Sequence, residues 1–330
     1  PSPVIALLSV LTPAQQRDFL FIDGKHLTTA GQTIESDYSY SLLIAPSQIS
    51  LLAENAVQDG LLRASSIQGQ IDLSAKHRGP RGINVWASTG MNRTKIKNET
   101  GFPTDSGTPF SGTVGLDYRT SGGVMLGAAF TIGTQKQDFS TGGHFDQTVG
   151  APSLYVAYKT GPVWGDAVAT YGLYQNKIER HVPLGIFADQ NNADVSGRSL
   201  ALAIRAGGDL KLGKVTTGPV AGLVLQQVRM NGFTETGTSG VTALMFDSQT
   251  RGSIVSQLGW RASVDIGDWQ PFAEAKWSHE WADKNRTVTA SLTTVPAPPY
   301  SMDAVPMAKD WASGSLGVVY KLSSQVMLRG

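Results

Sequence analysis

The sequence predicts an all-β transmembrane fold, an antiparallel up-and-down β-barrel with an α-helix in the lumen. Apolar side chains alternate with small or polar ones over stretches of about ten to twenty residues, and the connections alternate strictly between short and long. Transmembrane barrels show both features. Each strand has lipid on one face and the lumen on the other, and the turns are short on one side of the membrane only.

The alternation is clearest in two segments. One face of the first carries Val124, Leu126, Ala128, Phe130 and Ile132. One face of the second carries Ile254, Ser256, Leu258, Trp260, Ala262, Val264 and Ile266. A soluble β-sandwich would alternate too, but its strands usually run only about five or six residues. The length of the pattern therefore favours a membrane strand.

We expect ten strands and the start of another at Gln325. The ten lie near 82–97, 111–120, 123–139, 151–160, 162–182, 198–212, 218–230, 252–266, 269–281 and 309–322. Bacterial barrels have an even number of strands, so we expect the natural protein to continue about twenty to thirty residues past Gly330 and to complete twelve strands.

The connections assign a side of the membrane to each end of the barrel. Short turns are expected near 120–123, 159–162, 212–218, 267–269 and 322–325. Long polar loops are expected near 98–110, 140–151, 184–197, 231–251 and 282–309. Outer-membrane barrels have short periplasmic turns and long extracellular loops. We therefore expect the first strand to start in the periplasm and the C-terminus of the barrel to face it.

The composition fits a bacterial outer-membrane protein. Glycine is abundant, at 37 of 330 residues, and 16% of residues are charged, against about a quarter in typical soluble domains. No apolar run approaches the roughly 20 residues of a membrane helix. With no cysteine the chain has no thiol chemistry, and a net charge of +1 without a basic stripe argues against nucleic-acid binding. No signal peptide begins at Pro1, so we expect further residues before it.

Three regions divide the chain: 1–45, the end of a soluble domain; 46–75, a long helix; and 82–330, the barrel. Ser47 after Pro46 is a plausible helix N-cap. Apolar residues then recur at helical spacing at Ile49, Leu52, Ala53, Ala56, Val57, Leu61 and Ala64. The pattern alone fits a surface helix equally well. The helix leads directly into the first strand, however, so we expect it to thread the lumen.

Polar residues on the lumen side of the expected strands should form networks that hold the helix and the wall together. They are Arg205, Arg261, Asp265, Glu274, Lys276 and Glu280. Four other histidines have no ligand-like spacing, so we expect no metal and no cofactor. These are His77, His144, His181 and His279.

An Asp-x-x-His block stands near the N-terminus, in the string Phe21-Ile22-Asp23-Gly24-Lys25-His26-Leu27. It resembles the last conserved block of GDSL-type (SGNH) serine esterases, which supplies the acid and base of the triad. By that resemblance His26 would take the proton of a serine hydroxyl that attacks an ester, and Asp23 would orient the imidazole. Leu27 departs from the family, which usually has proline there. The Gly-Asp-Ser nucleophile block is missing, so we expect this chain alone to be inactive.

The order of these parts resembles the C-terminal end of a GDSL-type esterase or lipase autotransporter, a type V secretion protein. That resemblance implies a surface-exposed hydrolase passenger joined by a pore helix to a twelve-stranded translocator in the outer membrane. The partners it implies are outer-membrane lipid and lipopolysaccharide, the barrel assembly machinery, and an ester or lipid substrate for the passenger. We expect a monomer.

Two other functions remain open. A plain porin would not need a helix and a hydrolase block before its first strand. A barrel enzyme of the outer-membrane phospholipase type would need a serine and a histidine on the outer wall near one aromatic girdle, and no strand offers that pair convincingly.

Overall fold

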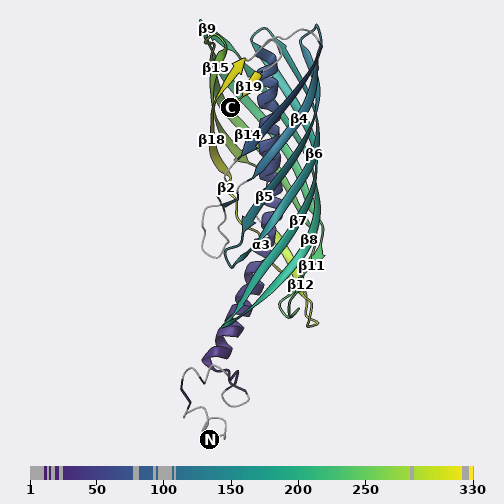
Figure 1. Cartoon of the computed structure of the whole chain (residues 1–330), viewed down its shortest axis with the longest axis vertical. Helices are drawn as coiled ribbons and strands as arrows, with labels where there is room; N and C mark the ends of the chain where they lie inside the picture. Colours follow the sequence, from purple (N-terminus) through teal and green to yellow (C-terminus); the bar gives the residue numbers. More distant parts are fainter. Residues whose placement is uncertain are drawn as a thin grey trace.

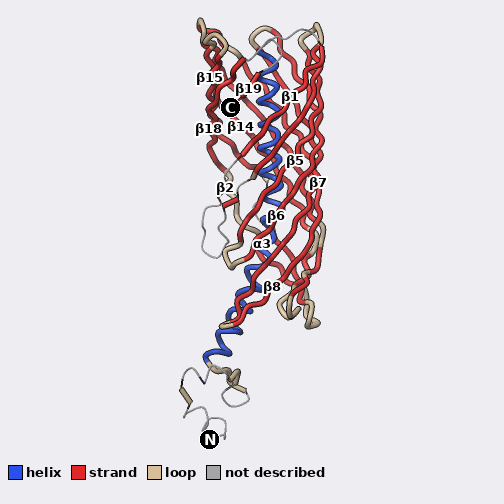
Figure 2. The backbone as a smooth tube through the Cα atoms, in the orientation of Figure 1, coloured by secondary structure: helices blue, strands red, loops and turns tan. Residues whose placement is uncertain are grey.

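The computed structural model describes residues 11–12, 15, 19–21, 25–76, 82–91, 94–95, 106–107, 109–282, 286–321 and 327–329. A tall, curved antiparallel sheet winds around one long helix, which emerges from one end together with the N-terminus (Figures 1 and 2). The predicted fold class, an antiparallel β-barrel with an internal helix, is confirmed.

Successive long strands pair with their neighbours in chain order, as an up-and-down barrel requires. They are β1 (Gly82–Met91), β4 (Phe110–Arg119), β5 (Val124–Asp138), β6 (Gly143–Thr160), β7 (Val163–Leu184), β8 (Phe187–Gly208), β10 (Val215–Met230), β14 (Gln249–Val264), β15 (Trp269–Glu280), β18 (Asp310–Lys321) and β19 (Met327–Arg329). Two short strands join them, β9 (Leu210–Leu212) beside β10 and β12 (Thr236–Gly237) beside β8. Within the described residues no ladder joins β1 to β19.

The two faces of the sheet have opposite character. Along β7 the side chains alternate between exposed and buried, so that Leu173 is 54% exposed while Tyr174 is 1% exposed. Exposed Leu, Ile, Val and aromatic side chains recur in this way on the outer face of neighbouring strands. A contiguous apolar surface of this extent is typical of contact with lipid.

The ends of the sheet also differ, and we name them by their connections. The turn end carries the short connections 120–123, 161–162, 209–214 and 265–268. Each of these turns contains a glycine with positive φ, for example Gly161 (φ 54°) and Gly267 (φ 59°), where a side chain would be strained. The loop end carries the hairpin tips 139–142 and 185–186 and the long segments 231–248 and 281–309.

Two segments expected to be long loops, 140–151 and 184–197, are largely strand. β5 and β6 pair as far as Asp138 and His144, and β7 and β8 pair as far as Leu184 and Phe187. Beyond the lipid band the outer face no longer needs apolar side chains, so the alternating pattern fades while backbone pairing continues. The sequence expectation was wrong here because it followed hydrophobicity alone.

The helix α3 runs from Thr29 to Lys76, so the expected start at Ser47 was also wrong. Its N-cap is Thr28, whose Oγ1 accepts a hydrogen bond from the Gly31 amide at 3.1 Å. Pro46 lies inside the helix, where its missing N–H leaves the carbonyl four residues earlier without its usual donor. Tyr300 Oη donates to that carbonyl, Leu42 O, at 3.0 Å. None of the described helices is long and apolar enough to cross a membrane.

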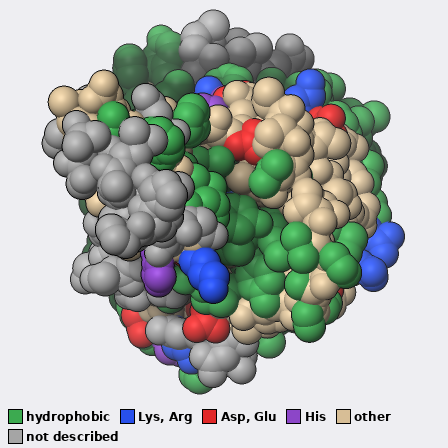
Figure 3. All heavy atoms as spheres, turned by 90° about the horizontal axis from the view of Figure 1, so that it is seen from below, with side chains coloured by type: hydrophobic (Ala, Val, Ile, Leu, Met, Phe, Trp, Pro, Cys, Tyr) green, Lys and Arg blue, Asp and Glu red, His purple; other side chains and the backbone are tan. Residues whose placement is uncertain are grey.

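A second, four-stranded sheet, which we call the cap, lies at the loop end. It consists of β11 (Phe233–Thr234), β13 (Leu244–Phe246), β16 (Thr287–Leu292) and β17 (Tyr300–Asp303). Another short pair, β2 (Thr94–Lys95) with β3 (Ser106–Gly107), extends the first loop. Seen from the loop end, most described side chains are hydrophobic or uncharged (Figure 3).

Candidate functional site

The interface between α3 and the inner wall is the candidate functional site. Helix residues such as Ile49, Leu52 and Ala53 are fully buried, and they pack with wall residues such as Phe145 and Val228. A second apolar cluster lies nearer the turn end and contains Ile67, Ile71, Trp86, Met125 and Tyr155. Between and beyond these clusters, polar side chains of the wall bind the helix. The lumen is thus occupied by packed protein.

The first polar cluster holds the C-terminal part of the helix to β7 and β8. The Arg205 guanidinium donates to Asp166 at 2.8 and 3.0 Å, to Asp72 of α3 at 3.0 Å, and to the Gln68 carbonyl at 3.1 Å. Gln68 Nε2 also donates to Asp166, at 3.0 Å. The side chains of Arg205 and Asp166 are buried, that of Asp72 is a quarter exposed, and each charge finds a counter-charge with good geometry. This is the arrangement that buried ion pairs require.

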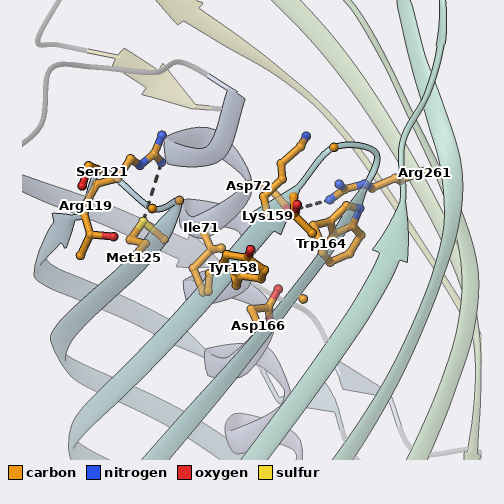
Figure 4. A pocket seen from close by; sticks show the side chains of 17 residues that line it. Ile71, Asp72, Arg119, Ser121, Met125, Tyr158, Lys159, Trp164, Asp166 and Arg261 are labelled. Carbon is orange, nitrogen blue, oxygen red and sulfur yellow. Dashed lines mark hydrogen bonds and ion pairs between the residues drawn. The ribbon is translucent and has the colours of Figure 1, made fainter.

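A second arginine extends the cluster to the turn end. Arg261 donates to Asp72 at 2.6 Å and to Asp209 at 2.9 Å, and its guanidinium lies 3.8 Å from the ring centre of Trp164. Figure 4 shows Arg261, Asp72 and Trp164 beside a cavity of about 430 Å³. Lys159 donates to Asp209 at 2.5 Å. Burial raises the pKa of the Asp209 carboxyl, but the hydrogen bonds from the two cations outweigh it and hold the pKa below its ordinary value.

In the middle of the lumen, α3 carries its own ion pair, Asp59 with Arg63, one turn apart. Tyr174 of β7 donates to Asp59 at 3.2 Å. Amide side chains of the wall donate to helix carbonyls at three heights: Gln147 to Leu52, Gln226 to Val57 and Gln249 to Ile49. The wall thus binds the backbone of the helix as well as its charged side chains.

A third cluster holds the helix near the loop end. Glu54 of α3 accepts from Arg251 at 3.0 Å and from Arg286 at 2.7 Å. Arg251 also pairs with Glu280 at 3.2 Å, and Glu280 accepts from Ser253 at 2.6 Å. Burial lowers the pKa of the Arg286 guanidinium, and Glu54 opposes that shift.

The cap and one hairpin complete the contacts. The Val305 amide donates to Ser50 Oγ at 2.9 Å, beside the contact of Tyr300 with the helix described above. The tip of the β7–β8 hairpin reaches farther, where the Gly185 amide donates to Asp37 at 2.7 Å. These contacts fix α3 where it leaves the barrel.

The six lumen residues expected to form polar networks separate into two groups. Those within the clusters above are Arg205, Arg261 and Glu280. Those outside them are Glu274, Lys276 and Asp265. Glu274 and Lys276 pair with each other at 2.7 Å, and Asp265 accepts from Gln270 near the turn end. In the part of the chain that the structure describes, none of these three forms a hydrogen bond or ion pair with α3.

Sequence reasoning missed the helix side of this interface, Glu54 and Asp72. Five turns of about 3.6 residues separate them, so they lie on one face of α3. Arg251 and Arg261 share the inner face of β14 in the same way. Acidic residues on one face of the helix and basic residues at the inward-facing positions of a strand form a pattern from which this pairing could have been predicted.

The Asp-x-x-His block lies beside the start of α3. Asp23 falls outside the described residues, and His26 is exposed. Phe21 bridges to Leu27 in antiparallel fashion, and the Thr28 amide donates to Leu20 O at 3.0 Å, so residues 20–21 lie beside residues 27–28. The described residues contain no group of His, Asp and Glu that could hold a metal ion.

Comparison with known proteins shows which family this architecture belongs to. Residues 85–330 match the family model described as the autotransporter beta-domain. An uncharacterized Pseudomonas putida protein from the trpE-trpG intergenic region is 32% identical over 86% of this chain and 48% of its own length. Esterase EstA of Pseudomonas aeruginosa is 28% identical over 94% of this chain and 49% of its own length. Lipase 1 of Photorhabdus luminescens is 26% identical over 84% and 41%. The chain therefore spans about half the length of these curated relatives.

Solved structures agree at the level of the fold. The translocator domain of autotransporter NalP from Neisseria meningitidis superposes with a TM-score of 0.65 at 18% identity, covering 84% of this chain and 88% of that chain. The beta domain of the Bordetella autotransporter BrkA gives 0.50 at 20% identity, covering 70% and 97%.

Proposed function

This chain belongs to the autotransporter family, and from that premise we propose that its barrel exports an esterase or lipase passenger and then anchors it at the cell surface. Translocator domains of this family are outer-membrane β-barrels, whose insertion depends on biogenesis machinery. The passenger is inferred from relatives named as esterase and lipase, together with the Asp-x-x-His block before α3.

The observation that carries the proposal is the way α3 is held. Buried ion pairs bind it near both ends of the lumen, through Asp72 and through Glu54, and its N-terminal part leaves at the loop end. A helix that only rested in the pore would not need counter-charges at both depths. The arrangement suits the end state of export, in which α3 is a permanent stalk and seal.

The orientation in the membrane is part of the proposal, and it is supported by the short turns at one end, which in outer-membrane barrels face the periplasm. If the turn end faces the periplasm, α3 delivers residues 1–28 to the outside, where the passenger would act on esters. Lipopolysaccharide would then surround the loop-end rim. In the full-length protein, His26 would take the proton of the nucleophilic serine and Asp23 would orient it.

Intact cells that express the full-length protein test the proposal. Antibody against the passenger should bind without permeabilisation, and cells should hydrolyse a soluble short-chain ester. His26→Ala should reduce that rate by about 10³-fold or more, as loss of a triad base does. His144→Ala, a histidine of the barrel wall, is the matched control and should keep the rate. Antibody binding only after permeabilisation would refute surface display, and an unchanged rate in His26→Ala would refute the catalytic assignment.

A further inference from the structure

Three chemically matched side chains lie side by side on the outer face of the barrel, on three neighbouring strands. Ser256 of β14 is directly opposite His279 of β15, and His279 is directly opposite Asp310 of β18. Residues directly opposite on one face of an antiparallel pair have Cβ atoms about 4.5–5.5 Å apart. Ser278 and Glu280 are buried on the inner face, so His279 faces outward.

The histidine is already oriented by the carboxylate. His279 Nδ1 lies 2.7 Å from Asp310 Oδ1. A carboxylate acceptor at Nδ1 places the proton there and leaves Nε2 with a lone pair. Among the contacts of the described residues, Nε2 of His279 has no hydrogen-bond partner. The imidazole is therefore set up as a proton acceptor on the outer wall.

Two tryptophans place this group at a defined depth. The His279 ring lies between Trp277 and Trp281, with centroid distances of 5.9 and 4.5 Å, and both tryptophans are exposed. Tryptophans on the outer face of a barrel mark the boundary between acyl chains and polar head groups. The ester bonds of membrane lipids lie at this boundary, so a lipid ester can reach the three residues.

We propose that Ser256, His279 and Asp310 form an ester-hydrolysing site on the barrel wall that acts on acyl esters of membrane lipids. Ser256 Oγ bonds to the acyl carbon while its proton passes to His279 Nε2. The ester C–O bond then breaks, and the released alcohol takes that proton. Water attacks the acyl-serine, gives one proton to His279, and releases the fatty acid, after which His279 returns the proton to Ser256. No oxidant or reductant is needed, and water is the only co-reactant.

Trp281 provides the hydrogen-bond donor that such a site requires. Its Nε1 donates to Ser256 Oγ at 2.9 Å. During attack the negative charge develops on the carbonyl oxygen of the ester, so this N–H becomes available to that oxygen once Ser256 Oγ has turned away from it. In this state Ser256 is bound to Trp281, and attack requires a rotation about its Cα–Cβ bond toward Nε2. Catalytic hydrogen bonds often tighten in this way only when substrate binds. Asp310 is a positioning residue, because it acts through His279.

This site is independent of the passenger. The nucleophile and base are on different strands, so a search along single strands cannot find them, and only the register brings them together. The 330-residue chain also suits the test, because it lacks the Gly-Asp-Ser block of the passenger. Lipid hydrolysis by this chain would have to come from the barrel.

The experiment uses the purified chain, folded into vesicles. One arm contains phosphatidylethanolamine with a labelled acyl chain, and the other contains lipopolysaccharide, so that the two ester sources are distinguished by the fatty acid released. Ser256→Ala and His279→Gln should each reduce release about 100-fold or more. His181→Gln is the matched control: it also faces outward and pairs with a carboxylate, Glu179, but it is opposite Gln190 rather than a serine. It should change nothing.

A second measurement removes any dependence on variant folding. A fluorophosphonate probe should label the wild-type chain at Ser256, located by mass spectrometry. Asp310→Asn should lower kcat and leave KM unchanged, and Asp310→Glu should restore part of kcat, which a merely structural residue would not do. No release above protein-free vesicles in both arms, or labelling absent from Ser256, would overturn the proposal.

Discussion

Replacing Arg205 with methionine should loosen α3 in the barrel. The substitution preserves much of the side-chain volume but removes every hydrogen bond to Asp166, Asp72 and the Gln68 carbonyl. Asp72 keeps Arg261, whereas the fully buried Asp166 side chain keeps only the neutral amide of Gln68. Breaking a buried pair by removing one partner costs about 3–5 kcal/mol. The second partner of Asp72 argues for the lower end, about 3 kcal/mol.

A loss of about 3 kcal/mol corresponds to a roughly 100-fold rise in the population of undocked helix, since each factor of ten is worth about 1.36 kcal/mol. Planar-bilayer recordings should show this as more frequent openings, and the urea midpoint of unfolding should fall. Lys276→Met is the matched control because its partner, Glu274, is also on the wall. If Arg205→Met conducted and unfolded like the wild type, the ion pairs would not be what retains the helix.

Three further predictions follow from the contacts at the two ends of α3. Deleting 47–73 should open the pore, and unchanged conductance of the deleted barrel would refute the seal. Tyr300→Phe should destabilise the protein by about 1 kcal/mol, because it leaves the partly buried Leu42 carbonyl without a donor. Adding Pro46→Ala should restore a helical N–H and recover most of that loss in urea titrations; equal losses in the single and double variants would contradict this account. Because the folded-state pKa of Asp209 is depressed below 3.8, its stabilisation is complete above that pH and is lost as pH falls through the lowered value. Asp209→Asn should therefore reduce stability at pH 7 and flatten its acid dependence, and identical unfolding curves of variant and wild type from pH 7 to 2 would count against it.

The sequence predicted the strands wherever lipid imposes a pattern. Leu173 is exposed on the outer face and Tyr174 is buried against α3, and this difference between the two faces produces the alternating pattern of the sequence. The hairpin extensions at 140–151 and 184–197 were missed because their outer face carries polar residues, such as Asp146 and Thr148, although the inner face is still buried, as Phe145 is. The start of α3 was missed because Pro46 normally marks a helix beginning, and only the distant hydroxyl of Tyr300 makes it acceptable inside one.

The candidate site was predictable only on the wall side. The inward direction of Arg205 and Arg261 follows from the alternation of side chains along a strand. The position of their partner Asp72, however, depends on the rotation of the helix and on its depth in the barrel. Packing sets both of these quantities, and local patterns do not encode them. The same limit applies to Ser256 and His279, which become neighbours through strand register alone.

The hydrogen bond from the Gly185 amide to Asp37 determines how rigidly the barrel holds a domain that is attached to α3. From Thr29 to Leu42, α3 extends on the order of 20 Å, at about 1.5 Å per residue, and a protruding hairpin grips it partway along. A domain joined to that helix would therefore be held at a fixed distance from the barrel and in a fixed orientation, rather than move freely on a flexible linker.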